Sequence, residues 1–413
     1  LFPYTTLFRS TYPSNDDTQE YQVPASKFDV VLDSLIADVE RVKDDAVRSY
    51  GEESVENTCR ITRWACYALL ADLYLWKGDW QKCIDYCDLV IDHKIKEYEE
   101  DYEENPTVLT TELYGKYPLI SESTANSNYA GNTYTEIFGE GNSFESIFEL
   151  NFVNNQSVTN AAVSRFYGNN TTKTGQIGAP SFLFTDAYAG LNDYFKKTDC
   201  RYLENMTEIN SKIYVTKYVN QSVSFRTSTT TGAAPTVNGS ARPQAYANWI
   251  IYRLTDVMLM RAEAEVELAG NVTADVPLTE EQTQHYRNAF ACVSAVWKRA
   301  NNKRVATTDT LVYDDYATSR TAMENLVLDE RQRELMFEGK RWFDLVRISR
   351  RDGDNTRLIN KVLPKFQENT SVIRIKLATP DILYWPYNKE ELKQNPYLTQ
   401  NPAYETDKTE QNK

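Results

Sequence analysis

The chain has 413 residues, a formal net charge of −14 and a hydrophobic content of 41%. This hydrophobic content is enough for a sizeable core and excludes a chain that is disordered over most of its length. The acidic balance excludes a general nucleic-acid binder, which needs a basic stripe. The densest basic run, 340–351, is interrupted by Asp344 and by apolar residues.

The first ten residues, LFPYTTLFRS, do not resemble a native start, and we expect a non-native tail on a chain whose N-terminal part is missing. No run of 18 apolar residues occurs, so the sequence predicts no membrane-spanning helix. We treat 11–413 as a single domain with three regions, which are helix pairs at 11–96, a loop-rich insertion at 97–245, and a C-terminal helical region with a tail at 246–413.

Region 11–96 is dominated by apolar residues at helical spacing. They predict helices at 26–45, 60–77 and 80–93, and Gly78 separates the last two. Two amphipathic helices joined by so short a turn pack antiparallel, and each pair leaves an apolar face that needs a neighbour. This arrangement is typical of tetratricopeptide-type arrays.

Region 97–245 is rich in Asn, Ser, Thr and Gly, and its periodicity is poor. Short apolar runs predict strands at 146–152 and 212–219, and one periodic stretch predicts a helix at 180–195. A polar segment at 222–240 predicts a loop. Because long loops on a rigid scaffold commonly carry binding sites, we expect the ligand-binding face in this region.

Helical periodicity returns in the last region. It predicts helices at 250–269, 279–301 and 320–338, and a short helical segment at 341–349. A single strand is predicted at 372–377, followed by an irregular tail. The predicted fold class is therefore mainly α, with tetratricopeptide-type helix pairs and a long loop-rich insertion that carries small strands.

The most charged segment lies near the C-terminal end of the third of these helices. Its charged residues are Glu330, Arg331, Arg333, Glu334, Glu338, Arg341, Asp344 and Arg347. They alternate with apolar residues, which predicts burial, and buried charges must be paired. A carboxylate pair could serve glycoside hydrolysis, but so many arginines would keep the carboxylates ionised, whereas a general acid needs a raised pKa. We therefore expect a structural ion-pair network here, and inter-helix pairing for Arg253, Asp256 and Glu263.

The six cysteines and two histidines form no pattern typical of a catalytic or metal site. Cys83 and Cys87 share a helix face and are expected in the core. The acidic run 97–104 could bind calcium, but it is better explained as a solvated surface. We predict no catalytic residue, no metal ligand and no cofactor, and we do not expect an enzyme.

Three blocks resemble signature blocks of the SusD/RagB family. They are ITRWACYALLADLYLWKGDWQKCIDYCDLVID at 61–92, IIYRLTDVMLMRAEAEVELAGN at 250–271 and LDERQRELMFEGKRWFDLVRI at 328–348. The segment 384–405 is similar to the closing motif of the family, with Gln400-Asn401-Pro402 in place. Ala403 departs from the pattern, because the family usually has Gly there.

The resemblance implies a SusD-like α-helical fold and an outer-membrane lipoprotein that faces outward, with a lipid anchor that precedes this chain. It further implies non-covalent capture of glycans, by aromatic stacking and hydrogen bonding, and their delivery to a SusC-like TonB-dependent transporter. Nucleic acid is not an expected partner. Two alternatives stay open: an intracellular tetratricopeptide scaffold that binds peptides and, less favoured, a helical glycoside hydrolase.

The family's ligand residues lie outside its signature blocks, so the candidate glycan contacts rest on local chemistry alone. Aromatic residues interleaved with amides are typical of sugar contacts. The first cluster is Phe166, Tyr167, Asn169 and Asn170 in RFYGNN, and the second is Tyr129, Asn132 and Tyr134 in NYAGNTY.

Overall fold

The structure is a computed structural model that describes residues 22–51, 54–104, 110–122, 124–125, 128–129, 132–153, 159–168, 175–189, 194–196, 198–226, 236–242, 246–273, 276–301, 311–366 and 368–405. The chain forms two compact units. One is Val39–Gly339, and the other combines Leu1–Asp38 with Lys340–Lys413. Neither boundary falls at 96 or 245, where we placed the limits of the predicted regions.

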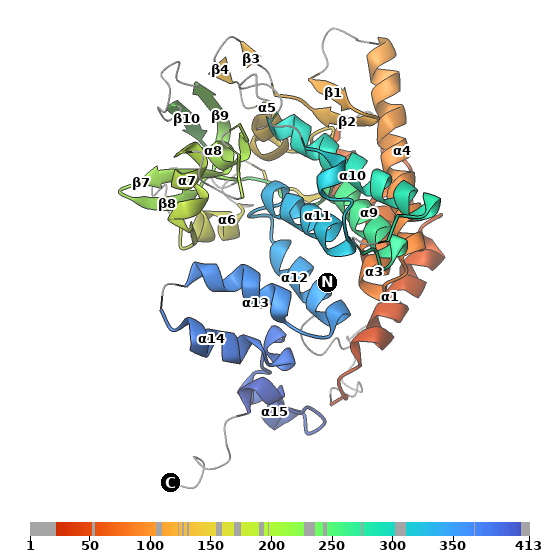
Figure 1. Ribbon diagram of the computed structural model, residues 1–413, viewed down its shortest axis with the longest axis vertical. Helices are drawn as coiled ribbons and strands as arrows, with labels where there is room; N and C mark the ends of the chain where they lie inside the picture. Colours follow the sequence, from red (N-terminus) through yellow and green to blue (C-terminus); the bar gives the residue numbers. More distant parts are fainter. Residues whose placement is uncertain are drawn as a thin grey trace. The chain divides into compact units, whose positions relative to one another are not determined.

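A helical array forms one part of the unit Val39–Gly339 (Figure 1). Its members are α2 (Ser54–Cys59), α3 (Arg63–Lys77), α4 (Trp80–Glu104), α9 (Leu254–Ala269), α10 (Glu280–Asn301) and α11 (Arg320–Glu334). Helix α9 packs against α3, α4, α10 and α11 and is buried around most of its circumference. The predicted helix pairs are therefore confirmed, and α9 supplies the neighbour that their apolar faces need.

The α3–α4 pair turns where the sequence predicts, but α3 begins at Arg63, three residues after the predicted start at 60. The Thr62 side chain caps α3 by accepting a hydrogen bond from the backbone N–H of Ala65, and Gly78 ends it at φ 79°. Helix α4 continues past the predicted end at 93 to Glu104, so the acidic run 97–104 is helical. That stretch contains no Gly or Pro and is rich in Glu, a good helix former.

The start of the predicted helix at 250–269 is wrong. Residues Trp249–Arg253 form strand β11, which pairs antiparallel with β5 (Ser146–Leu150), and α9 begins only at Leu254. The sequence WIIYR consists mostly of β-branched and aromatic residues, which suit a half-buried strand. Its partner, SIFEL, is the strand that the sequence predicted.

The insertion contains more regular structure than we predicted. Its strands are β1 (Thr111–Tyr114), β2 (Tyr117–Ile120), β3 (Thr124–Ala125), β4 (Asn128–Tyr129), β6 (Gly178–Ala179), β7 (Met206–Ile209), β8 (Lys212–Val215), β9 (Asn220–Arg226) and β10 (Thr236–Ala241). They form a β1–β2 hairpin and sheets in the orders β10-β9-β4-β3 and β6-β8-β7. The loop predicted at 222–240 is wrong, because β9 and β10 pair across it. Its Ser and Thr residues suggested a loop, although Thr also suits strands.

Short helices complete this region. They are α5 (Asn132–Tyr134), η1 (Thr135–Glu140), α6 (Ala161–Phe166), η2 (Ser181–Leu183), α7 (Thr185–Ala189) and α8 (Arg201–Asn205). Among the described residues of 180–195, the predicted helix is present as two fragments, η2 and α7. A continuous apolar core joins these elements, and it includes Ile120, Tyr134, Phe138, Tyr167, Phe195, Tyr202, Tyr218 and Met336. The insertion is a packed part of its unit, not a set of loops laid over the helices.

The second unit is helical over its described residues. It contains the start of α1 (Phe28–Val42), then α12 (Arg341–Asp352), α13 (Thr356–Val362), η4 (Leu363–Lys365), α14 (Thr370–Leu377), η5 (Pro380–Leu383), α15 (Lys389–Gln394) and η6 (Pro402–Tyr404). The strand predicted at 372–377 is wrong, because these residues form α14. The described residues of this unit contain no strand with which the segment could pair. Its backbone N–H and C=O groups therefore form their hydrogen bonds within the segment, as a helix.

Two amides of the closing motif fasten the tail. Asn401 Nδ2 donates to the carbonyl oxygens of Asp381 and Tyr384, both at 2.9 Å. Gln400 exchanges two hydrogen bonds with the backbone of Tyr387, at 2.9 and 3.1 Å. Ala403 has no positive φ, so its backbone does not need the glycine that is usual there.

Candidate ligand-binding site

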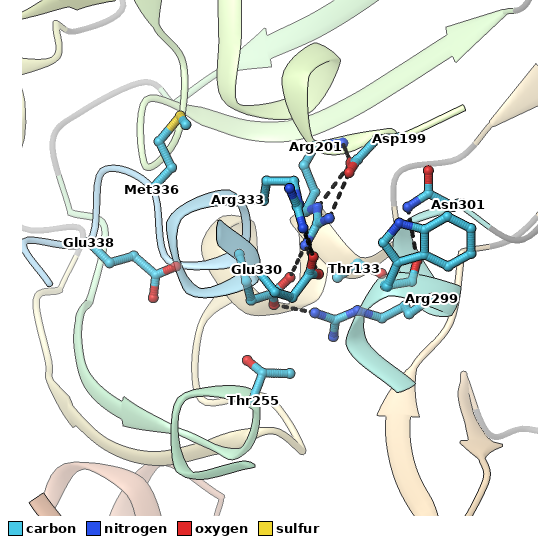
Figure 2. A network of polar contacts seen from close by, with 12 residues as sticks. Thr133, Asp199, Arg201, Thr255, Arg299, Asn301, Glu330, Arg333, Met336 and Glu338 are labelled. Atoms are coloured by element: carbon cyan, nitrogen blue, oxygen red, sulfur yellow. Dashed lines mark hydrogen bonds and ion pairs between the residues drawn. The ribbon is translucent and has the colours of Figure 1, made fainter. Parts of the chain in front are cut away.

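A network of buried charges joins side chains from α8, β11, α10 and α11 and from residues beside β5, β8, α8 and α11, and we call it the brace (Figure 2). Its cations are Arg201, Lys217, Arg253 and Arg299, and its anions are Glu145, Asp199, Glu330, Glu334 and Glu338. Every one of these residues is at most 5% exposed. Such burial is tolerated only when each charge is paired and hydrogen-bonded.

The pairing in the brace is dense. Arg253 binds Glu334 Oε1 through Nη1 at 2.6 Å, and it binds both carboxylate oxygens of Glu338 at 2.7 and 2.9 Å. Arg201 Nη1 lies 2.7 Å from Glu330 Oε1, and its Nη2 lies 2.6 Å from Asp199 Oδ2. Figure 2 shows Arg201 held between these two carboxylates. The predicted ion-pair network is therefore confirmed.

The protonation of the brace follows from these contacts. Burial would raise the pKa of Glu334, but Arg299, Arg253 and Arg201 hold it well below the usual range. The pKa of Glu338 is lowered in the same way, because Arg253 and Lys217 outweigh its burial. Neither carboxyl group has the raised pKa that a general acid needs.

A second predicted pairing is also present. Arg331 Nη1 lies 3.1 Å from Asp256 Oδ1 and so joins α11 to α9. In the other unit, Arg347 Nη2 lies 3.0 Å from Asp344 Oδ1, within α12. Charged side chains of the segment 328–348 therefore form buried ion pairs in both units.

The turn after α11 is fixed by side chains from the insertion. The helix ends at Glu334, four residues before the predicted end, and Phe337 has a φ of 66°. Lys217 Nζ donates to the carbonyl oxygens of Glu334 and Met336, at 3.2 and 3.0 Å. The Tyr167 hydroxyl donates to the carbonyl oxygen of Phe337 at 2.6 Å. These contacts hold a left-handed conformation that a non-glycine residue adopts only at a cost.

Two of the predicted sugar-binding tyrosines lie in the core. Tyr134 is 1% exposed, and its hydroxyl donates to the carbonyl oxygen of Thr216 at 2.7 Å. Tyr167 is 8% exposed and stacks on Tyr218. In this conformation neither ring is available to a ligand, so the structure corrects these two predictions. The predictions failed because a tyrosine next to Asn and Gly has the same local sequence whether it lies in the core or in a binding loop.

Among the described residues, the other predicted contacts belong to different elements. Phe166 is 41% exposed at the end of α6, and the Arg165 guanidinium lies over its ring at 5.8 Å. Asn132 begins α5 and is half-buried, and Tyr129 belongs to β4. Asn169 and Asn170 lie outside the described residues.

A cleft of about 540 Å³ lies beside the brace, and we call it the aromatic cleft. Its rings are those of Tyr194, Trp297 and Tyr316, and its polar side chains are Lys196, Asp199, Asp315, Asn325, Asp329 and Arg333. Two of these residues are held by the brace, because Asp199 pairs with Arg201 and Arg333 Nη2 lies 2.8 Å from Glu330 Oε2. The cleft therefore has polar groups in fixed positions between aromatic side chains.

The sequence analysis missed this cleft. Trp297 lies within a predicted helix, and Tyr316 follows a segment of which 302–310 is outside the described residues. The helix places Trp297 near Tyr194, Lys196 and Asp199 and near α11, all of which are distant in sequence. The alternation of aromatic and acidic residues in YDDY, 313–316, was the one local signal available.

One buried group has metal-ligand chemistry among the described residues. The ligand atoms of Glu122, Cys200 and Glu204 lie within 4.8 Å of one another. All three line a cavity of about 20 Å³ together with Arg201, Lys217 and Arg299. These three cations oppose the binding of a further cation, and the space suits a single water molecule.

The model of the SusD family matches residues 120–404, which include the brace, the aromatic cleft and the closing motif. The chain belongs to the SusD family. No curated protein sequence matches it.

Solved structures of the SusD family have the same fold. Surface glycan-binding protein A from Bacteroides uniformis aligns with a TM-score of 0.57 and 20% identity, over 97% of this chain and 74% of that one. A SusD superfamily protein from Bacteroides thetaiotaomicron aligns with a TM-score of 0.55 and 17% identity, over 97% of this chain and 72% of the other. A SusD-like protein from Bacteroides fragilis gives a TM-score of 0.54 and 16% identity, over 98% and 76%. The predicted SusD-like fold is confirmed.

Proposed function

We propose that this protein binds glycans non-covalently at the cell surface and delivers them to a SusC-like TonB-dependent transporter of the outer membrane. Membership of the SusD family supports this function. One structural neighbour is described as a surface glycan-binding protein, which agrees with the proposal. Within the described residues, no helix is long and apolar enough to cross a membrane. We propose attachment through a lipid anchor on the outward face.

The aromatic cleft is the proposed glycan site. Its volume of about 540 Å³ falls within the usual range of small-molecule sites. The C–H faces of a sugar ring can pack on Trp297, Tyr194 or Tyr316, while the carboxylate and amide oxygens accept hydrogen bonds from sugar hydroxyls. No strained protonation state is needed for such binding.

The observation that carries this proposal is the position of Asp199 and Arg333. Both line the cleft, and both are fixed from behind by ion pairs with the brace. Polar groups that are already ordered lose little conformational entropy when a ligand binds. Asp199 therefore belongs to both the brace and the cleft, and the other brace residues support the binding surface from behind.

The insertion is proposed to add contacts at its surface. Phe166 is the one predicted aromatic residue whose described side chain is exposed. Together with Asn132, Tyr129, Asn169 and Asn170 it is proposed as a peripheral contact for longer glycans.

The test is a glycan array followed by calorimetric titration of the best neutral oligosaccharide. Tyr316→Ala should weaken binding about tenfold, because a stacked ring and its packing are lost. Tyr397→Ala is a matched control, since Tyr397 is exposed and does not line the aromatic cleft. Thermal unfolding of both variants would verify that they fold.

Three results would contradict the proposal. Unchanged affinity in Tyr316→Ala would remove the aromatic cleft as the site. Failure of the wild-type protein to bind any glycan would remove the function. Release of reducing sugars by the purified protein would show a hydrolase and overturn the assignment as a binding protein.

A further inference from the structure

A second cavity, of about 550 Å³, lies on another face of α10, and we call it the basic cavity. The turn of the β1–β2 hairpin forms one wall with Lys116, and α10 forms another with Arg287, Phe290, Ser294 and Lys298. Tyr313 completes the lining. The proposed function makes no use of this cavity.

The spacing along α10 explains the shape of the basic cavity. Arg287, Phe290, Ser294 and Lys298 follow one another at steps of three or four residues, so they lie on one face of the helix. The small Ser294 in the middle of the stripe leaves room between the two terminal cations. The hollow is therefore a consequence of side-chain size on a regular helix.

The charge of the cavity has one sign. No Asp or Glu is among its described lining residues, although the whole chain carries a net charge of −14. Arg261 also lines the cavity, but its charge is compensated, because Nε lies 2.6 Å from Asp88 Oδ1 and Nη1 lies 2.9 Å from Glu265 Oε1. Arg261 therefore stabilises the wall of the cavity and adds little to the attraction of an anionic ligand.

The other three cations have no such compensation. Among the described residues, no carboxylate lies within ion-pair distance of Lys116, Arg287 or Lys298. Arg287 lies over the Tyr313 ring at 5.6 Å, and Lys116 lies over the Tyr117 ring at 5.5 Å. Each of these cations remains exposed, so it can still form an ion pair with a ligand.

Aromatic rings also line the basic cavity. Phe290 and Tyr313 meet edge to face, with their centroids 5.5 Å apart at 89°. Tyr117 is fixed below them, with its hydroxyl oxygen 3.1 Å from the Sγ atom of Cys292. The cavity thus offers a packing surface for a ring and several donors for an anion.

We infer that the basic cavity binds an acidic sugar, a ring that carries a carboxylate or a sulfate group. The anion pairs with the guanidinium of Arg287 and the ammonium groups of Lys116 and Lys298, and the sugar ring packs against Phe290 and Tyr313. The sugar class rests on the proposed function, whereas the preference for an anion rests on the charge of this cavity. Neutral glycans bind at the aromatic cleft instead.

The test compares oligogalacturonate, a sulfated oligosaccharide and a neutral oligosaccharide of equal length, by calorimetric titration of the full chain. The double variant Arg287→Gln/Lys298→Gln should weaken binding of the acidic ligand about tenfold or more and leave neutral binding unchanged. The carboxylated and sulfated ligands show which anion is recognised. Wild-type affinity for the acidic ligand should also fall with added salt, since exposed charges are screened.

A matched control separates local contacts from overall charge. Arg374→Gln/Lys376→Gln removes one Arg and one Lys from exposed positions of α14, and neither residue lines the basic cavity. This control should keep wild-type affinity for the acidic ligand. Equal loss in both double variants would mean non-specific attraction and would overturn the inference.

The remaining outcomes distinguish the inference from the proposed function. Acidic ligands that bind equally well to wild type and to Arg287→Gln/Lys298→Gln would overturn the inference alone. No binding of any acidic ligand, with neutral binding intact, would also overturn it and leave the proposed function standing. No binding of either kind would overturn both.

Discussion

Two adjacent residues of α10 show how differently this protein uses positive charge. Arg299 is 3% exposed and belongs to the brace, where Glu145 and Glu334 bind it. Lys298 is exposed and lines the basic cavity, where no described carboxylate pairs with it. One step along a helix turns the side chain by about 100°, which separates the two environments. The comparison teaches that a residue's type says little about its role until its partners are known.

The two regions also differ in what a ligand could gain. In the brace every cation already has an anionic partner, so a further anion would have to displace one. In the basic cavity Lys116, Arg287 and Lys298 are exposed to solvent, and a ligand would exchange water for a charge-assisted hydrogen bond. We therefore expect substitutions in the brace to change stability and substitutions in the basic cavity to change ligand binding.

The largest expected effect is on stability. Arg299→Gln should lower the free energy of unfolding by about 3–5 kcal/mol, because it leaves buried carboxylates without their partner. Lys298→Gln, its matched control, should change the free energy of unfolding by less than about 0.5 kcal/mol. Urea denaturation followed by circular dichroism would measure both. Similar free energies of unfolding for the two variants would contradict the different roles of Arg299 and Lys298.

The next effect is an acid transition that belongs to the brace. The pKa values of Glu334 and Glu338 are lowered in the folded protein, so their contribution to stability is complete above the unfolded value of about 4.3. It is lost as the pH falls through the lowered folded values. Urea denaturation between pH 5 and 3 should show a falling free energy of unfolding, with a smaller slope in Glu338→Gln. An equal slope in that variant would contradict this assignment.

His93 should add a smaller dependence of stability on pH, at higher pH than the acid transition of the brace. Burial lowers the pKa of His93 from 6.5 to about 4, and its ring stacks on Trp64 at 3.8 Å. The unfolded chain binds a proton between these values and the folded chain does not, so stability should fall as the pH drops from 6.5 to about 4. His93→Gln should remove this part of the pH dependence. A nuclear magnetic resonance titration of His93 would measure its pKa directly, and a value near 6.5 would contradict the prediction.

The sequence predicted features that depend on spacing. Helix α10 lies where the apolar periodicity placed it, and the cluster from Glu330 to Glu338 proved to be ion-paired, as its alternation with apolar residues required. Both inferences rest on local pattern and on the cost of burying a charge. They needed no knowledge of distant partners beyond the fact that partners must exist.

Features that depend on distant partners were not predictable. Tyr167 is a core residue because of Phe337, which is 170 residues away. Trp249–Arg253 is a strand because β5 is available to pair with it, and Thr370–Leu377 is a helix in a unit without a described strand. The aromatic cleft joins Tyr194, Trp297 and Tyr316, so no window of sequence displays it.

The brace also constrains the order in which the chain can fold. Arg299 and Glu145 are 154 residues apart, and Arg201 and Glu330 are 129 apart. During synthesis Glu145 leaves the ribosome long before its partner Arg299, and Arg253 leaves long before its partner Glu338. Contacts between residues so far apart in sequence therefore form late in folding. We expect a nascent chain that stops short of Glu338 to leave Lys217 and Arg253 without this partner. The unit Val39–Gly339 is therefore expected to complete the brace only when almost all of its own sequence has been made.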